Sequence, residues 1–286
     1  MNTQFWLIQA FNGLSYGALL FLVGSGLSLI FGVMRIVNLS HGSYFLLGGY
    51  VALSVIWTTG SWALALPIAA LSIAVVGLLM ERIFLRPLGF DPLRQVLLTV
   101  GFAFLFQQAA LDIWTGNNFD INPPDALTRS VVIGGLYLPL YRIFMIAMAA
   151  AIGIVLWLVM EKTRMGAAVR ATVDDAQMAR GVGIDTSRIS MFIFALGAFL
   201  AALGGVIGGA FLGIYPGLDF EMLPIAFAVV IIGGMGSLGG AAIGALLVGL
   251  ADNFGKALFP EVSYFTLYAP MALILAVKPT GLFGRE

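Results

Sequence analysis

The sequence predicts an all-α fold, a polytopic transmembrane helix bundle of about eight to ten membrane segments, some of them short or broken. Of the 286 residues, 60% are hydrophobic and only 10% are charged, whereas soluble domains carry about 25% charged residues. Apolar runs of about 20 residues, the length that crosses a bilayer as a helix, recur along the whole chain. The mean hydropathy of +1.02 agrees with both observations. We therefore expect a single transmembrane domain, residues 1–286, surrounded by membrane lipid.

Nine apolar runs, each bounded by charged or turn-forming residues, are the predicted membrane segments. They span residues 11–33, 43–57, 62–85, 95–114, 138–160, 190–214, 222–232, 241–254 and 263–277. The second is short, and the seventh and eighth are short halves that flank the glycine-rich run 233–240. These halves are either two spans or one broken, re-entrant pair, because each glycine costs a helix about 1 kcal/mol relative to alanine. We expect the run to be a tight bend in which some glycines have a positive φ.

Glycines also recur four residues apart within the predicted segments, as in the pairs Gly13/Gly17 and Gly204/Gly208. The chain contains 36 glycines, where an average usage of about 7% would give roughly 20. Small residues at this spacing allow transmembrane helices to approach closely. The pattern therefore predicts tight contacts between helices.

Basic residues gather in the loops on one side of the nine-segment arrangement. Eleven of the 14 fall there: Arg35, Arg82, Arg86, Arg94, Lys162, Arg164, Arg170, Arg180, Arg188, Lys278 and Arg285. Cytoplasmic loops are enriched in lysine and arginine, so this side, with the C-terminus, is predicted to be cytoplasmic. The N-terminus is then outside, and no basic stretch precedes the first apolar run as a cleaved signal peptide would require.

Polar and ionisable groups near the membrane segments are few. Asp112 and Arg142 lie toward the outer ends of their segments, where they form either a polar interface, with an ion pair between them, or the mouth of a path. Asp219 falls in an outer loop. The junction of the first two segments holds Asn38 and His41, and a lone histidine there is more typical of a hydrogen-bonded helix end than of a proton relay.

The residue inventory excludes several kinds of chemistry. Cysteine is absent and His41 is the single histidine, so neither a zinc cluster nor a histidine-based triad is expected, and no metal or cofactor is predicted. The nearest match to a phosphate-binding Walker sequence, at Lys256, lacks the Ser or Thr that should follow the lysine. Acidic and basic residues balance, so nothing indicates nucleic acid. We do not expect an enzyme, and the chain should not hydrolyse ATP.

The inner loop, residues 161–189, carries one recognisable element. Asp174 and Asp175 precede a short helical run, 176–182, that Gly183 ends. Carboxylates at the start of a helix and glycine at its end are common boundary residues. On composition alone, this helix is either a plain surface feature or a functional one.

Four sequence blocks resemble the branched-chain amino-acid type permeases of bacterial ABC importers. They are GLSYG (13–17) leading to GVMRIVNLSHG (32–42), the pairs ER (81–82) and RP (86–87), a pattern at 166–184 in the inner loop, and GGMGSLGG (233–240) with Gly244. Leu39 and Ser40 replace the Phe-Ala that is more usual in the first block. The resemblance is specific because four blocks match in order.

The resemblance implies that the chain is a permease subunit that works with partners in a bacterial inner membrane. These are a second, homologous permease that makes the pair a heterodimer, two cytoplasmic ATP-binding subunits and a periplasmic solute-binding protein. The inner loop would dock on an ATP-binding subunit. The residues that match the family's pattern there are Gly166, Arg170, Ala171, Asp175, Ala179, Arg180, Gly183 and Ile184. ATP-driven movement of this loop would alternate the opening of the bundle.

The resemblance also implies that two junctions line the translocation path. The candidate path residues are Asn38, Ser40, His41, Gly42, Gly233, Gly234, Gly236, Ser237, Gly239 and Gly240. Independently, short or glycine-interrupted segments in the two halves of a transporter point to its binding site. The expected solutes are branched-chain amino acids or a related small polar solute such as urea or a short amide. A stand-alone channel is the alternative, whereas a membrane-embedded enzyme would need catalytic residues that the chain lacks.

Overall fold

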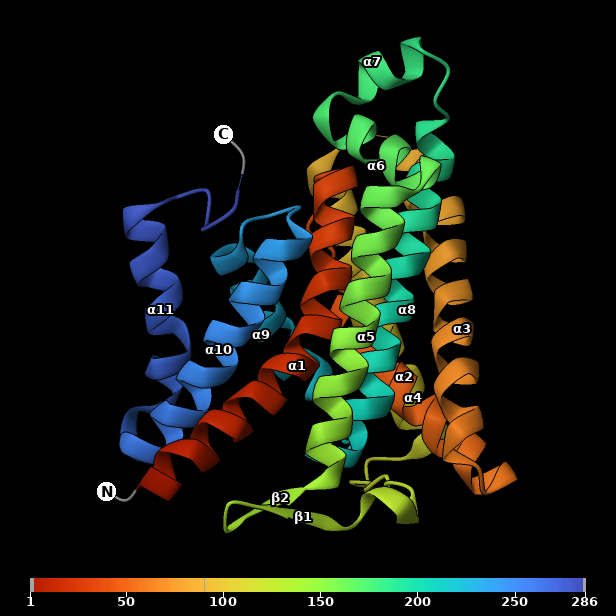
Figure 1. Cartoon of the computed structure of the whole chain (residues 1–286). Helices are drawn as coiled ribbons and strands as arrows, with labels where there is room; N and C mark the ends of the chain where they lie inside the picture. The colour runs from red at the N-terminus through yellow and green to blue at the C-terminus, as the bar shows by residue number, and fades with distance from the viewer. Residues whose placement is uncertain (1–2, 90, 285–286) are drawn as a thin grey trace.

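In the computed structural model, which describes residues 3–89 and 91–284, the chain folds almost entirely into helices (Figure 1). The apolar helices are α1 (Thr3–Met34), α2 (His41–Thr59), α3 (Trp62–Met80), α4 (Pro92–Trp114), α5 (Leu140–Lys162), α8 (Thr186–Leu212), α9 (Leu218–Gly233), α10 (Leu238–Leu258) and α11 (Ser263–Val277). Between them lie two short helices, α6 (Arg164–Asp174) and α7 (Ala176–Gly181), and an antiparallel hairpin of β1 (Ser130–Ile133) and β2 (Leu136–Pro139). The predicted fold class is confirmed.

Six helices are long and apolar enough to cross a membrane, counted over residues 3–89 and 91–284. They are Thr3–Met34, Trp62–Leu88, Pro92–Trp114, Leu140–Lys162, Thr186–Leu212 and Leu238–Leu258. Each of the nine predicted segments corresponds to a helix, and α2, α9 and α11 are the three outside this set. The eighth segment is longer than predicted, because α10 incorporates Gly239 and Gly240 into its first turn.

The helices α1 and α8 form the buried centre of the bundle, and glycine allows their backbones to touch. A Cβ at Gly26 would lie 3.1 Å from the Cα of Gly197 on α8. On another face of α1, a Cβ at Gly13 would lie 2.9 Å from the Cα of Leu250 on α10. These contacts confirm the tight helix packing that the glycine spacing predicts.

The helices α3, α4 and α5 surround this centre and keep one face uncovered. Each exposes large apolar side chains, such as Leu71 of α3, Leu97 of α4 and Ile154 of α5. An apolar surface of this extent on a helix long enough to span a bilayer is the surface expected to face lipid.

The two ends of the bundle differ in character. Figure 1 shows the end of α1, α6, α7 and the described C-terminal residues at one end, and the β1–β2 hairpin at the opposite end. The basic loops predicted to be cytoplasmic are therefore together, although Arg285 lies outside the described residues. The inner loop contains α6, which the sequence analysis missed, as well as the predicted short helix, α7. Asp175 begins α7 by accepting hydrogen bonds from the backbone N–H groups of Gln177 (2.8 Å) and Met178 (2.9 Å).

An ion pair between Asp112 and Arg142, one of the two interpretations of these residues, is not formed. Asp112 Oδ1 accepts a 2.9 Å hydrogen bond from Gln108 Nε2 one turn earlier in α4. Arg142 donates to Asn12 Oδ1 and lies 5.0 Å from the ring centroid of Phe211. Asn12 is within reach of Arg142 because α5 packs beside α1.

Candidate functional site

The first predicted junction lies in the interior of the bundle. After α1 ends, residues 35–40 run without helical structure, and α2 begins where His41 Nε2 donates a 3.0 Å hydrogen bond to Val23 O. Val23 lies eleven residues before the end of α1, which is about 16 Å along a helix. The helix α2 therefore starts inside the bundle, in the manner of the broken helices that form transporter sites.

The side chains of this junction are directed into protein. Asn38 Oδ1 accepts hydrogen bonds from the backbone N–H (3.1 Å) and the hydroxyl (2.7 Å) of Ser40, a local arrangement that fixes the turn before α2. Asn38, Ser40 and His41 are all fully buried. Asn38 Nδ2 and His41 Nδ1 have no hydrogen-bond partner within the described part of the chain.

A buried carboxylate joins this junction, and its position corrects the sequence analysis. Asp219, predicted to lie in an outer loop, is in the first turn of α9 and only 2% exposed. Its Oδ2 accepts a 3.1 Å hydrogen bond from Ser43 Oγ, while Oδ1 has no partner among the described residues. Gly42 allows this approach, since a Cβ there would collide with the backbone O of Asp219. The prediction failed because α9 begins four residues earlier than the apolar run; the acidic first turn after Gly217 was the available signal.

The second predicted junction, 233–240, is a tight bend beside the last turns of α1. Only residues 234–237 leave the helical conformation, and Gly234 (φ +99°) and Gly236 (φ +80°) have the predicted positive φ. Ser237 Oγ then accepts a 3.0 Å hydrogen bond from Gly240 N and begins α10. A Cβ at Gly236 would lie 2.9 Å from the Cα of Gly32, so the bend rests directly on the backbone of α1.

The last described residues of the chain cover the end of α9. Leu282 N donates to Ile232 O (2.9 Å), and Phe283 N donates to Gly233 O (3.0 Å). Carbonyl groups in the last turn of a helix have no partner within that helix. The C-terminal segment therefore supplies two of the hydrogen bonds that the end of α9 needs.

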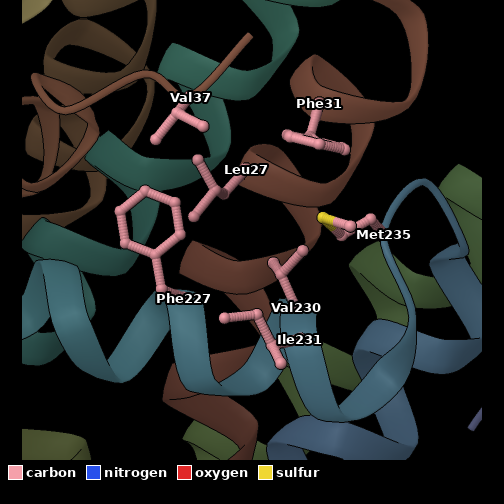
Figure 2. Close-up of a pocket in the computed structure, with 7 residues that line it drawn as sticks. All are labelled: Leu27, Phe31, Val37, Phe227, Val230, Ile231 and Met235. Atoms are coloured by element: carbon pink, nitrogen blue, oxygen red, sulfur yellow. The ribbon is translucent and has the colours of Figure 1, made fainter. Parts of the chain in front are cut away.

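An apolar groove of about 290 Å³ lies between the two junctions (Figure 2). Its lining side chains are Leu27 and Phe31 of α1, Val37 of the segment after α1, Phe227, Val230 and Ile231 of α9, and Met235 of the bend. Val37 precedes Asn38, and Met235 lies between Gly234 and Gly236, so the groove connects the places that the sequence indicated. None of the ten candidate path residues is itself among the lining residues described, so their role stays a prediction.

The chemistry of the groove follows from its walls. All seven side chains are apolar, so the groove can take up an aliphatic or aromatic group and offers no charged side chain to a polar one. These residues could not be recognised in the sequence, because leucine, valine and phenylalanine in a membrane helix look the same whether they pack in the core or line a cavity. Their proximity to the two junctions is the only sequence signal.

The candidate docking residues of the inner loop divide into buried and exposed sets. Gly166 packs against the end of α5, and Ala179 is 3% exposed; Gly183 has φ +89°, so it forms the turn after α7. Arg170 donates to Met160 O and forms a 3.6 Å ion pair with Glu161. These residues therefore shape the loop. The most exposed large apolar residues described in the loop are Met178 (66%) and Val182 (71%), followed by Met165 (41%), none of which stood out in the sequence.

The comparisons with known proteins agree on one kind of protein. Residues 9–275 match the family model described as branched-chain amino acid transport system, permease component. The chain is 32% identical to the high-affinity branched-chain amino acid transport system permease protein LivH of Salmonella typhimurium, over 100% of this chain and 98% of that protein. It is 28% identical to the permease BraD of Pseudomonas aeruginosa (98% and 96% covered) and 27% identical to LivM of Escherichia coli (91% and 67% covered).

Proposed function

The chain belongs to the family of branched-chain amino acid transport permeases, and on this basis we propose that it forms the translocation path of an ABC importer for branched-chain amino acids. Proteins of this family are multi-pass membrane transport proteins and not enzymes. The proposal places this chain in the bacterial inner membrane with its C-terminus and the loop 161–189 in the cytoplasm, in keeping with the basic residues at that end.

The apolar groove is the observation that carries the choice of solute. A branched aliphatic side chain that leaves water for such a groove gains about 25 cal/mol per Å² of buried surface. Urea or a short amide would lose hydrogen bonds to water there and find no replacement among the seven apolar side chains. Leucine, isoleucine and valine are therefore the proposed solutes, in preference to urea or short amides.

A second permease completes the proposed path. LivH and LivM of Escherichia coli, both similar to this chain, are each named as a permease protein of the high-affinity branched-chain amino acid transport system. By analogy we propose a heterodimer in which the partner permease supplies the wall that faces the groove. A periplasmic binding protein would deliver the solute to the outer end.

Two cytoplasmic ATP-binding subunits would drive the cycle through the inner loop. The exposed side chains of Met178 and Val182 offer them an apolar docking face. Movement of α7 would be passed to α6, which contacts both α5 and α1. Because α1 supplies Leu27 and Phe31 to the groove, such movement would alter the shape of the path.

Reconstitution tests the proposal. The permease pair, the ATP-binding subunits and the binding protein are placed in liposomes, and transport of radiolabelled leucine, valine and urea is measured with and without ATP. We expect ATP-dependent transport of leucine and valine and none of urea. Leucine flux through this chain without ATP or partners would instead support the stand-alone channel, and preference for urea would refute the proposed solute class.

A further inference from the structure

A second pocket, of about 270 Å³, lies at the joint between the inner loop and the helix bundle. One wall comes from the bundle, with Met34 at the end of α1 and Glu81 and Arg86 after α3; the other comes from the inner loop, with Thr172 of α6 and Arg180 of α7. The volume is near the lower end, about 300 Å³, of small-ligand pockets. It suits a ligand the size of one amino acid and is too small for a nucleotide.

Glu81 is the residue that marks this pocket as a binding site. It begins a π-helical turn, Glu81–Leu85, and such turns occur frequently at functional sites. Its side chain is 2% exposed, and Oε2 has no hydrogen-bond partner within the described residues. A buried carboxylate oxygen without a partner is costly, so the site is suited to a ligand that brings a cationic hydrogen-bond donor.

The rest of the lining fits the other parts of an amino acid. Arg86 and Arg180 line the pocket, and Asp185, also in the lining, is paired with Arg188 (2.9 Å), so the two arginines offer positive charge to a carboxylate. Val33, Leu85 and Ile184 provide an apolar side for an aliphatic group. An ammonium group against Glu81, a carboxylate toward the arginines and an aliphatic chain between them describe a free branched-chain amino acid.

We propose that this pocket binds a branched-chain amino acid from the cytoplasmic side and that occupancy slows transport. This inference rests on the proposed function, since it takes the transported solute as the ligand. A ligand between Glu81 of the bundle and Arg180 of α7 holds the loop and the bundle in one relative position. Transport needs these two parts to move relative to each other. A ligand that binds in one relative position therefore shifts the population of transporters toward that position and away from the other conformations of the transport cycle. The product would thus limit its own import.

The experiment uses the complete transporter in liposomes with its ATP-binding subunits facing outward. The lumen, which corresponds to the periplasm, holds the binding protein and radiolabelled leucine, and ATP is supplied outside. Unlabelled leucine added outside reaches only the cytoplasmic face, and the rate at which label leaves the lumen is measured. Each variant is compared with its own rate without external leucine, so that a change in basal transport does not enter the result.

We expect external leucine to slow the release of label, with a half-inhibitory concentration about tenfold higher in Glu81→Gln, the loss expected for one charge-assisted hydrogen bond. Arg86→Gln should weaken inhibition in the same way. Arg82→Gln, on the same turn but outside the pocket lining, should leave it unchanged. Neither 4-methylpentanoate, which lacks the ammonium group, nor isoamylamine, which lacks the carboxylate, should inhibit as leucine does.

Three results would overturn the inference. The first is an unchanged rate of release with external leucine, and the second is inhibition of Glu81→Gln and the native chain at the same concentration; in both cases ATP-dependent release of label would still support the proposed function. Inhibition by isoamylamine or an inorganic cation that depends on Glu81 would make the pocket a cation site. A transporter that moves no labelled leucine with ATP would refute the proposed function itself.

Discussion

Ser43 and Asp219 meet in the interior of the bundle, where Ser43 Oγ donates a 3.1 Å hydrogen bond to Asp219 Oδ2 and joins the first turns of α2 and α9. Hydrogen bonds to charged groups contribute about 1.5–3 kcal/mol. We expect Ser43→Ala to lower the thermal midpoint of the detergent-purified protein. Ser25→Ala is the control, because Ser25 Oγ donates only to Leu22 O of its own helix. An equal decrease in the thermal midpoint of both variants would show that the hydrogen bond to Asp219 contributes no more stability than the local one made by Ser25.

Gly236→Val should abolish leucine uptake while the protein still inserts into the membrane. A valine at φ +80° is strained, and its Cβ would press on the backbone of Gly32. Gly101→Val in α4 is the control, since no atom lies within 4 Å of a Cβ there. Uptake and abundance in the membrane fraction are measured together. Normal uptake by Gly236→Val would show that the bend tolerates a change of shape.

Met178→Asp should uncouple transport without unfolding the loop. Its side chain is 66% exposed on α7, so the folded chain accepts the charge, whereas a docked ATP-binding subunit would bury it at a cost of several kcal/mol. Uptake and co-purification of the ATP-binding subunits are the measurements, and both should fall.

The comparison variant is Ala179→Asp. Ala179 is 3% exposed within this chain, so a charge there should loosen the loop itself and raise its sensitivity to protease. If Met178→Asp transported normally, the exposed face of α7 would have no part in docking.

Met235→Glu should reduce leucine uptake about tenfold or more, because a charge in the apolar groove must lose water or obstruct the passage of an aliphatic side chain. Met235 is 47% exposed, so the substitution should not prevent folding. Met235→Leu keeps the apolar wall and should retain uptake. The path assignment would be wrong if Met235→Glu and Met235→Leu transported leucine equally.

Orientation can be tested directly, since the chain has no cysteine of its own. A membrane-impermeant thiol reagent should label Val132→Cys, on the exposed hairpin strand β1, in intact spheroplasts. It should label Gln177→Cys, on the exposed side of α7, only after the cytoplasmic face becomes accessible. The reverse pattern would invert the proposed topology.

Glycine patterns carried much of what the sequence could predict about the fold. The spacing of Gly13 and Gly17 indicated a close helix crossing, and the run 233–240 indicated a bend with positive φ; both features are present. What the pattern could not show is which helix each glycine meets. Gly77 looks like a neutral position in a lipid-facing segment, yet a Cβ there would lie 2.6 Å from the Cβ of Ala198 on α8. Partner identity is a property of the tertiary arrangement.

The candidate site was predictable only in part, for a similar reason. The two junctions stood out because polar residues and glycines are conspicuous in an apolar chain. Phe227 and Val230 were not conspicuous. They line a groove because no side chain fills the space beside them, and the sequence does not show where such a space lies. Asp219 was misplaced by the assumption that a charge ends a membrane helix. In the structure the carboxylate of Asp219 lies inside the bundle, where it accepts a hydrogen bond from Ser43.

The hydrogen bonds from Leu282 and Phe283 to the end of α9 have a consequence for biosynthesis. The acceptors at the end of α9, Ile232 and Gly233, are synthesised fifty residues before the donors. At about 5–20 residues per second, the donors follow several seconds later. The end of α9 cannot acquire its final hydrogen bonds while Leu282 and Phe283 are still within the ribosome. Closure of this end of the α9–α10 hairpin therefore waits until Leu282 and Phe283 have left the ribosome, which makes it a late step in the folding of the chain.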